Sequence, residues 1–104
     1  PLYTMDGDVV GTPAYMAPEQ AAGELSRMGP HSDVYALGAM LYHLLAGHMP
    51  YVLPGTRWNN YALWQRVQEG PPERIEKLAP RTPPELAAIC EKAMAREIGA
   101  RYPD

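Results

Sequence analysis

The sequence has little cysteine and no basic excess. It contains one cysteine, Cys90, in 104 residues, so no internal disulfide bond forms and no oxidising compartment is required. Its 9 Lys and Arg stand against 12 Asp and Glu, which gives a net charge of −3. A protein that neutralises nucleic-acid phosphates, or a polybasic membrane anchor, needs the opposite balance. We therefore expect no nucleic-acid partner.

Long hydrophobic runs are also lacking. The longest mostly apolar stretch covers residues 34–46, which is too short for a membrane span of about 20 residues. Residues 1–6 have neither the charged start nor the apolar run of a signal peptide. We expect a cytoplasmic location, and any membrane tether of a parent protein would lie outside these residues.

Self-contained catalytic and metal-binding patterns are absent as well. The three histidines, His31, His43 and His48, form no metal-ligand spacing with one another, with Cys90 or with paired carboxylates. No glycine-rich phosphate loop followed by lysine occurs. The sequence thus predicts no catalytic residue, no metal ligand and no bound cofactor in this chain. We expect His43 and Cys90 to be packed structural residues.

What is present is a series of helical segments separated by prolines and glycines, which number 12 and 9. No segment alternates in the manner of a strand. We expect a mainly α fold with irregular loops and helices near residues 17–23, 32–46, 60–69 and 83–95.

The segment at 32–46 has the strongest helical signal. Ser32 is a suitable N-cap, and Gly47 suits the position just past the C-terminus. The segment is apolar nearly all round, which is typical of a buried helix. One fully buried helix in so short a chain indicates the axis of a larger domain. Its main apolar stripe is Val34, Leu37, Leu41, Leu44 and Leu45.

The last helix carries a start signal. Residues 82–85 read Thr-Pro-Pro-Glu, which predicts a capping box with proline at the first helical position. Apolar residues then recur at helical spacing and predict the buried face. They are Leu86, Ile89, Cys90, Ala93 and Met94.

Three motifs in order, followed by an arginine, carry a resemblance to a known family. Residues 11–19 read Gly-Thr-Pro-Ala-Tyr-Met-Ala-Pro-Glu, and residues 32–38 read Ser-Asp-Val-Tyr-Ala-Leu-Gly. Residues 47–51 read Gly-His-Met-Pro-Tyr, and Arg101 follows near the end. In these features the sequence resembles serine/threonine protein kinases of the bacterial, eukaryotic-like type, from the activation loop onward. The resemblance covers essentially the whole chain.

The resemblance implies a partial kinase C-lobe that is truncated at both ends. Residues 1–16 would be the end of the activation segment with its substrate-docking loop, and residues 17–104 the helical part of the lobe. Thr12 would contact a catalytic aspartate upstream and implies Ser/Thr specificity. The substrate-binding residues would be Gly11, Thr12, Pro13, Ala14 and Tyr15.

The resemblance also implies regulatory and structural roles. Thr4 and Thr12 are candidate phosphorylation sites, because a phosphate adds nearly two negative charges and can order a loop. Glu19 would form a buried ion pair with Arg101. Asp33 would accept hydrogen bonds from the backbone of the catalytic loop. In each case a plain surface, turn or helix-start residue is the competing interpretation.

One departure weakens the register of Arg101. The family usually has Asp-Pro shortly before this arginine, and the present sequence has Glu97 and Ile98 there. Without the proline the turn before Arg101 is less constrained.

The parent kinase would transfer the γ-phosphoryl group of ATP to Ser or Thr of protein substrates, with ATP and Mg²⁺ as cofactors. The glycine-rich loop, strand lysine, catalytic Asp and Asn, and metal-binding Asp of the family are not in this sequence. The fragment alone is thus expected to be inactive and to bind no cofactor.

The expected partners are protein substrates, the N-lobe and catalytic loop of the same parent, and other copies of the fragment through apolar surface. Two alternatives stay open. One is a pseudokinase lobe or non-catalytic binding module, which replaced aspartates upstream would reveal. The other is a small helical interaction protein whose resemblance is accidental.

Overall fold

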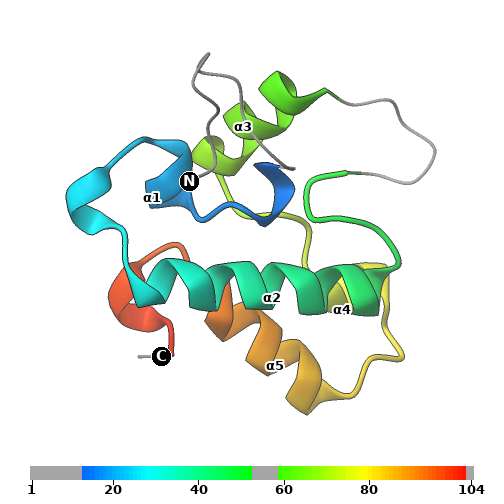
Figure 1. Ribbon diagram of the computed structural model, residues 1–104. Coiled ribbons are helices and arrows are strands. Elements are labelled where there is room, and N and C mark those ends of the chain that lie inside the picture. The colour runs from blue at the N-terminus through cyan, green and yellow to red at the C-terminus, as the bar shows by residue number, and fades with distance from the viewer. Residues whose placement is uncertain (1–12, 53–58, 103–104) are drawn as a thin grey trace.

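A computed structural model describes residues 13–52 and 59–102 of the chain, and all of its regular elements are helical (Figure 1). The prediction of a mainly α fold is therefore confirmed for these residues. The α-helices are α1 (Pro18–Ala21), α2 (Pro30–Ala46), α3 (Asn60–Glu69), α4 (Ile75–Leu78) and α5 (Pro84–Ala93). Short 3₁₀ turns are η1 (Pro13–Tyr15), η2 (Leu25–Arg27) and η3 (Ile98–Ala100). None of the helices in the described ranges is long and apolar enough to cross a membrane.

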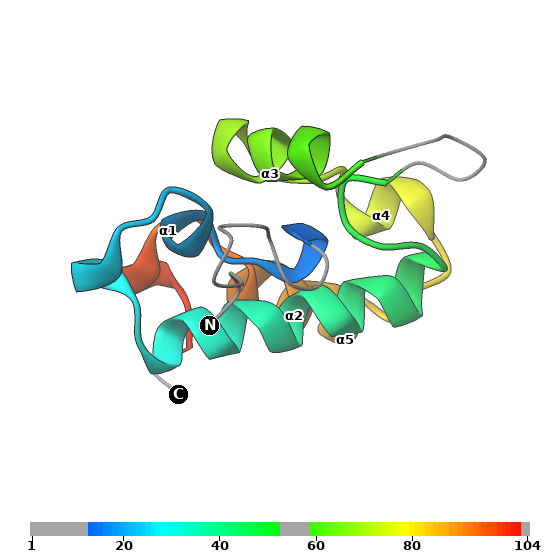
Figure 2. The same ribbon diagram turned by 45° about the horizontal axis from the view of Figure 1, so that its top comes forward.

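Helix α2 is the longest element, and α4, α5 and η1 pack against it. Helix α5 lies against one side of α2, and η1 lies between α2 and α3 (Figures 1 and 2). The helix begins two residues before the predicted start, with Gly29 as N-cap and Pro30 in the first turn. The prediction of Ser32 as N-cap is wrong, because its hydroxyl oxygen instead accepts a hydrogen bond from the Gly29 amide at 3.3 Å. Gly47 ends the helix with a φ of 83°, as its position predicts.

The buried face of α2 differs from the predicted stripe. The residues it buries are mostly small or aromatic, namely Ser32, Val34, Tyr35, Gly38, Ala39 and Tyr42. Leu37 and Leu44 of the predicted stripe are 64% and 82% exposed, and Met40 is 52% exposed. This part of α2 is therefore uncovered within the described residues, although its apolar character predicts burial in a larger domain. The hydropathy of a helix shows that its apolar surface needs a packing partner. It does not show whether the chain itself or another molecule supplies that partner.

Helices α2 and α5 approach each other closely at Gly38. A Cβ atom at Gly38 would lie 2.7 Å from the Cβ of Ala93 and 2.9 Å from the Cγ of Met94. The Cys90 thiol beside them donates to the Gly38 carbonyl at 3.4 Å. Burial raises the pKa of Cys90 to about 11, so this cysteine is a packed residue rather than a reactive thiolate. The absence of a side chain at Gly38 is what allows this helix packing.

Helix α5 does not start as predicted. Its N-cap is Pro83, and no side chain caps the helix. The capping box expected at residues 82–85 is therefore wrong, because α5 begins one residue late for Thr82 to be the N-cap. Leu86 and Ile89 are 38% and 44% exposed, so the buried face consists of Ala87, Cys90 and Ala93.

Two further boundaries differ from the prediction. Helix α1 is a single turn, Pro18–Ala21, and the chain leaves it through Gly23 with a φ of 72°. Helix α4, Ile75–Leu78, was not predicted, because one turn of helix is too short to show a period. It contributes the buried Ile75 to the cluster around Tyr35 and Tyr42.

Helix α3 has the predicted bounds, and the Asn59 side chain caps it by accepting a hydrogen bond from the Ala62 amide at 2.8 Å.

Candidate functional site

The candidate site is centred on residues 13–21, which comprise η1 and α1. Of the predicted docking residues, the structure describes Pro13, Ala14 and Tyr15, while Gly11 and Thr12 lie outside the described residues, as does Thr4. A hydrogen bond from the Met16 amide to the Pro13 carbonyl at 2.9 Å closes the η1 turn. The segment is therefore a defined turn that runs directly into α1.

Two side chains hold the η1 turn from opposite sides. Ala14 is fully buried against Val52 and Leu63. The Tyr15 hydroxyl lies 2.6 Å from Nδ1 of His43 on α2, and the two rings stack with centroids 6.1 Å apart. Partial burial raises the pKa of Tyr15. These contacts fix the turn to both α2 and α3.

Glu19 and Arg101 form a buried, two-pronged ion pair. The Arg101 Nη1 lies 2.7 Å from Oε2 of Glu19, and Nη2 lies 2.8 Å from Oε1. The side chains of Arg101 and Glu19 are 0% and 2% exposed. Two parallel hydrogen bonds of this kind give orientation as well as energy. The pair joins residues 82 positions apart in the sequence, so it ties α1 to the C-terminal part of the chain.

The surroundings of Glu19 keep it ionised. Burial by itself would raise its pKa, but hydrogen bonds from Arg101 and from Ser32 outweigh that effect and lower the pKa to about 2. The Ser32 hydroxyl donates to Oε2 of Glu19 at 2.7 Å. Ser32 thus links α1 to the first turn of α2. The position of Ser32 in the sequence predicts helix capping, and no pattern points to this contact.

The remaining donors of Arg101 are also satisfied. Its Nε donates to the Ala95 carbonyl at 2.6 Å, and Nη1 donates to the His31 carbonyl at 3.1 Å. The guanidinium lies 5.0 Å from the centre of the Tyr35 ring, a cation–π distance. No buried side-chain nitrogen or oxygen lacks a hydrogen-bond partner in the described residues. Despite Glu97 and Ile98 in place of Asp-Pro, Arg101 reaches Glu19.

A tyrosine pair continues from this ion pair toward α3. The hydroxyls of Tyr35 and Tyr51 lie 3.0 Å apart, and Nη1 of Arg96 lies 3.5 Å from the Tyr51 hydroxyl. Arg96 also donates to the Val67 carbonyl at 2.6 Å, near the C-terminal end of α3. Tyr51 has a φ of 71°, which is rare for a residue with a side chain. The sequence identified Tyr51 through its motif, but no pattern marked Arg96.

Asp33 lies apart from this cluster. It follows Ser32 in the first turn of α2, but its side chain is exposed. The structure therefore does not bring Asp33 together with Glu19 and Arg101. A negative charge at this position suits the positive end of the helix dipole. Its expected contact with a catalytic loop stays a prediction.

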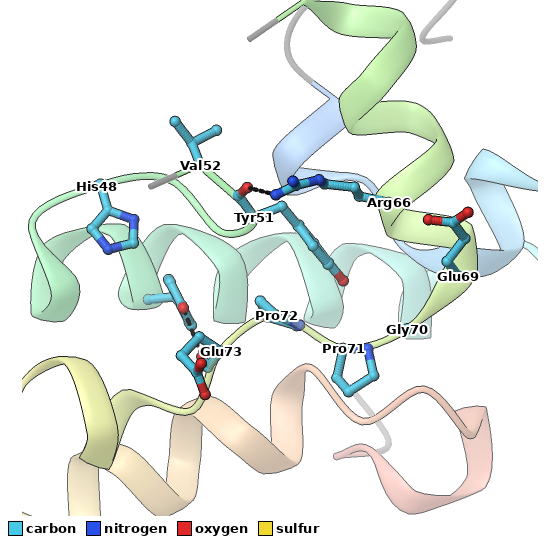
Figure 3. A pocket seen from close by; sticks show the side chains of 10 residues that line it. His48, Tyr51, Val52, Arg66, Glu69, Gly70, Pro71, Pro72 and Glu73 are labelled. Atoms are coloured by element: carbon cyan, nitrogen blue, oxygen red, sulfur yellow. Dashed lines mark hydrogen bonds between the residues drawn. The ribbon is translucent and has the colours of Figure 1, made fainter. Parts of the chain in front are cut away.

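A cavity of about 380 Å³ lies between the C-terminal half of α2, the end of α3 and the segment that follows α3 (Figure 3). Polar groups in its wall are engaged with the chain itself. The Tyr42 hydroxyl donates to the Glu73 carbonyl at 2.6 Å, and Arg66 donates to the Tyr51 carbonyl at 2.9 Å. Within the described ranges, no group of three or more side chains is arranged to hold a metal ion.

One protein family and several known proteins match most of this chain. Residues 4–102 match the family described as the protein kinase domain. Serine/threonine-protein kinase PknB of Mycolicibacterium smegmatis is 38% identical over 99 residues, which are 95% of this chain and 15% of the relative. DNA damage-responsive serine/threonine-protein kinase RqkA of Deinococcus radiodurans is 38% identical over 98 residues, 94% of this chain and 14% of the relative.

A relative whose name gives a different acceptor specificity is equally similar. Tyrosine-protein kinase MasK of Myxococcus xanthus is 39% identical over 100 residues, which are 96% of this chain and 15% of the relative. The chain thus spans about 15% of the length of the curated relatives it matches.

Proposed function

This chain belongs to the protein kinase domain family, and from that premise we propose that it is the substrate-docking part of a protein serine/threonine kinase. The parent would transfer the γ-phosphoryl group of ATP to Ser or Thr side chains of protein substrates. Residues 1–16 would be the end of its activation segment, and residues 17–104 part of its C-lobe. The acceptor class follows from Thr12, which stands in the docking motif and would contact the catalytic aspartate.

The observation that carries this proposal is the buried pair of Glu19 and Arg101. It holds α1 against the lobe, and α1 directly follows the predicted docking residues 11–15. A docking surface must keep one geometry while substrates exchange, because misplacement of the reacting groups costs rate. A buried, fully hydrogen-bonded pair at the base of the segment supplies that rigidity.

Other roles follow from the same proposal. Asp33, exposed at the start of α2, would accept hydrogen bonds from the catalytic-loop backbone of the parent. Thr4 and Thr12 are candidate phosphorylation sites of the activation segment. Asp6 and Asp8 already place negative charge near Thr4, so activation would depend only weakly on phosphate at that site.

The residues of this chain do not fit ATP and Mg²⁺ by themselves. Family members bind the nucleotide with a glycine-rich loop and a strand lysine, and the metal with an Asp and an Asn. The sequence holds none of these motifs. In our proposal the nucleotide and metal are bound by other parts of the parent, and the isolated chain transfers no phosphate.

The test uses the full-length parent kinase with labelled ATP and three peptides that differ only in a Ser, Thr or Tyr acceptor. We expect transfer to Ser and Thr. Thr12→Ala should lower kcat, and Thr12→Ser, which keeps the hydroxyl, should restore it. The isolated 104-residue chain, rigorously purified, should show no transfer.

The outcomes separate the alternatives. Transfer to Tyr alone would overturn the Ser/Thr assignment and favour a specificity like that in the name of MasK. No transfer by the full-length protein would favour the non-catalytic lobe. Equal kcat in the wild type and in Thr12→Ala would remove the proposed role of Thr12.

A further inference from the structure

Helix α3 touches both ends of residues 14–21, a segment that begins in the predicted docking residues and ends with α1. Near the start of the segment, Leu63 of α3 packs on Ala14. At its end, Val67 and Trp64 of α3 pack with Met16 and Ala21. Figure 2 shows η1 and α1 beneath α3. The helix therefore contacts the segment at two points, while the ion pair of Glu19 holds it from the other side.

Within the described residues, Trp64 makes the one polar contact between α3 and this segment. Its indole N–H donates to the Ala21 carbonyl at 2.6 Å, and the two residues are 43 positions apart in the sequence. Ala21 is the last residue of α1, where a carbonyl has no later helical amide to accept from. Ala21 is 1% exposed, so water has little access to that residue. The indole thus satisfies a helix-end carbonyl from another helix.

We propose that Trp64 is a positioning residue for substrate recognition, because its indole N–H fixes the end of α1 and thereby the docking turn before it. The proposal rests on the proposed function of residues 11–15. Trp64 does not touch the substrate in this scheme. It sets the distance between α3 and α1, while Leu63 carries the same constraint to Ala14.

Trp64→Phe is the sharpest change, because it keeps an aromatic ring and removes the N–H donor. In the full-length kinase we expect the KM for the peptide substrate to rise about fivefold, the effect of one lost hydrogen bond. The values of kcat and of the KM for ATP should stay within about twofold. The matched control is Tyr61→Phe, which removes a hydroxyl from the exposed face of the same helix, where Tyr61 is 65% exposed.

A second measurement does not depend on activity. Amide hydrogen exchange reports the opening of individual hydrogen bonds. In Trp64→Phe the amides of Met16 and Ala21, which bond to Pro13 and Ala17, should exchange about five times faster, again as expected for one lost hydrogen bond. The amide of Met94, which bonds to Cys90 at the end of α5, should keep its rate. Tyr61→Phe should change none of these rates.

Each outcome decides the question. Faster exchange in residues 16–21 with a raised peptide KM supports the positioning role. Unchanged exchange there overturns it, and so does equal acceleration at Met94, because Trp64 would then stabilise the whole lobe. Faster exchange with an unchanged peptide KM overturns the link to substrate recognition. If the wild-type kinase phosphorylates no peptide, the proposed function fails, and exchange alone decides whether Trp64 positions the segment.

Discussion

Neutralising Glu19 should destabilise this protein far more than neutralising a surface carboxylate. Glu19→Gln keeps the shape of the side chain but leaves the Arg101 charge buried without a counter-charge. Both side chains are almost fully buried, at 2% and 0% exposed. Breaking a buried pair by removing one partner costs about 3–5 kcal/mol of the free energy of unfolding. The effect should therefore be several kcal/mol rather than tenths.

The pH dependence of stability offers a second test of the same ion pair. The pKa of Glu19 falls from its ordinary value of 4.5 to about 2 in the folded state, which corresponds to about 3 kcal/mol of stability. Because the folded pKa is depressed, this contribution is complete above about pH 4.5 and is lost as the pH falls toward 2. The stability difference between wild type and Glu19→Gln should narrow over the same window.

The assay is urea denaturation of the full-length kinase, followed by tryptophan fluorescence, on a double-mutant cycle. The cycle combines Glu19→Gln with Arg101→Met, which replaces the charge by an apolar chain. The double variant should lose much less than the sum of the single losses, because no uncompensated charge is left buried. Glu24→Gln is the control, since Glu24 and Arg27 form an exposed pair at 3.6 Å. It should cost under about 0.5 kcal/mol.

The reasoning is refuted if Glu19→Gln is as mild as Glu24→Gln. It is also refuted if the losses of the two single variants simply add. Either result would mean that Glu19 and Arg101 are independently solvated in solution. A stability difference that stays constant from pH 5 to pH 2 would contradict the depressed pKa.

Two further predictions concern helix α2. Gly38→Ala should lower the free energy of unfolding, measured by urea titration, by about 1–3 kcal/mol, because the added methyl group overpacks the contact with α5. Gly70→Ala is the control and should be nearly neutral, because a Cβ atom at Gly70 meets nothing within 4 Å. The isolated chain should self-associate through the exposed apolar face of α2, so Leu37→Ser with Leu44→Ser should reduce its sedimentation coefficient toward the monomer value. Leu25→Ser is the control, because Leu25 is 79% exposed on η2 rather than on α2, and it should leave the association unchanged. A wild-type chain that is monomeric would contradict self-association through α2.

Much of the fold was predictable because local sequence patterns specify where its helices lie. The stop at Gly70 and the apolar spacing before it place α3 at residues 60–69. Gly47 ends α2 where a left-handed residue is needed. Helix starts were less predictable, because several residues near each start can serve as caps. Ser32 and Thr82 both look like caps, yet Gly29 and Pro83 take the position.

The sequence by itself determined the helical class, the segment order and the motifs that mark residues 11–19, 32–38 and Arg101. It also placed Thr12 and Asp33 at motif positions whose partners the described residues do not include. These are properties of neighbouring residues and their spacing, so they need no knowledge of the folded chain.

Only the tertiary structure decided which distant groups meet. The resemblance implied the pair of Glu19 and Arg101, but nothing in the sequence indicated the contact of Glu19 with Ser32 or that of Trp64 with Ala21. The tertiary structure also decided that α2 buries Tyr35 and Gly38 while Leu37 and Leu44 face outward. A helix that is apolar all round gives no preferred direction, so the neighbours that pack against it choose the buried face.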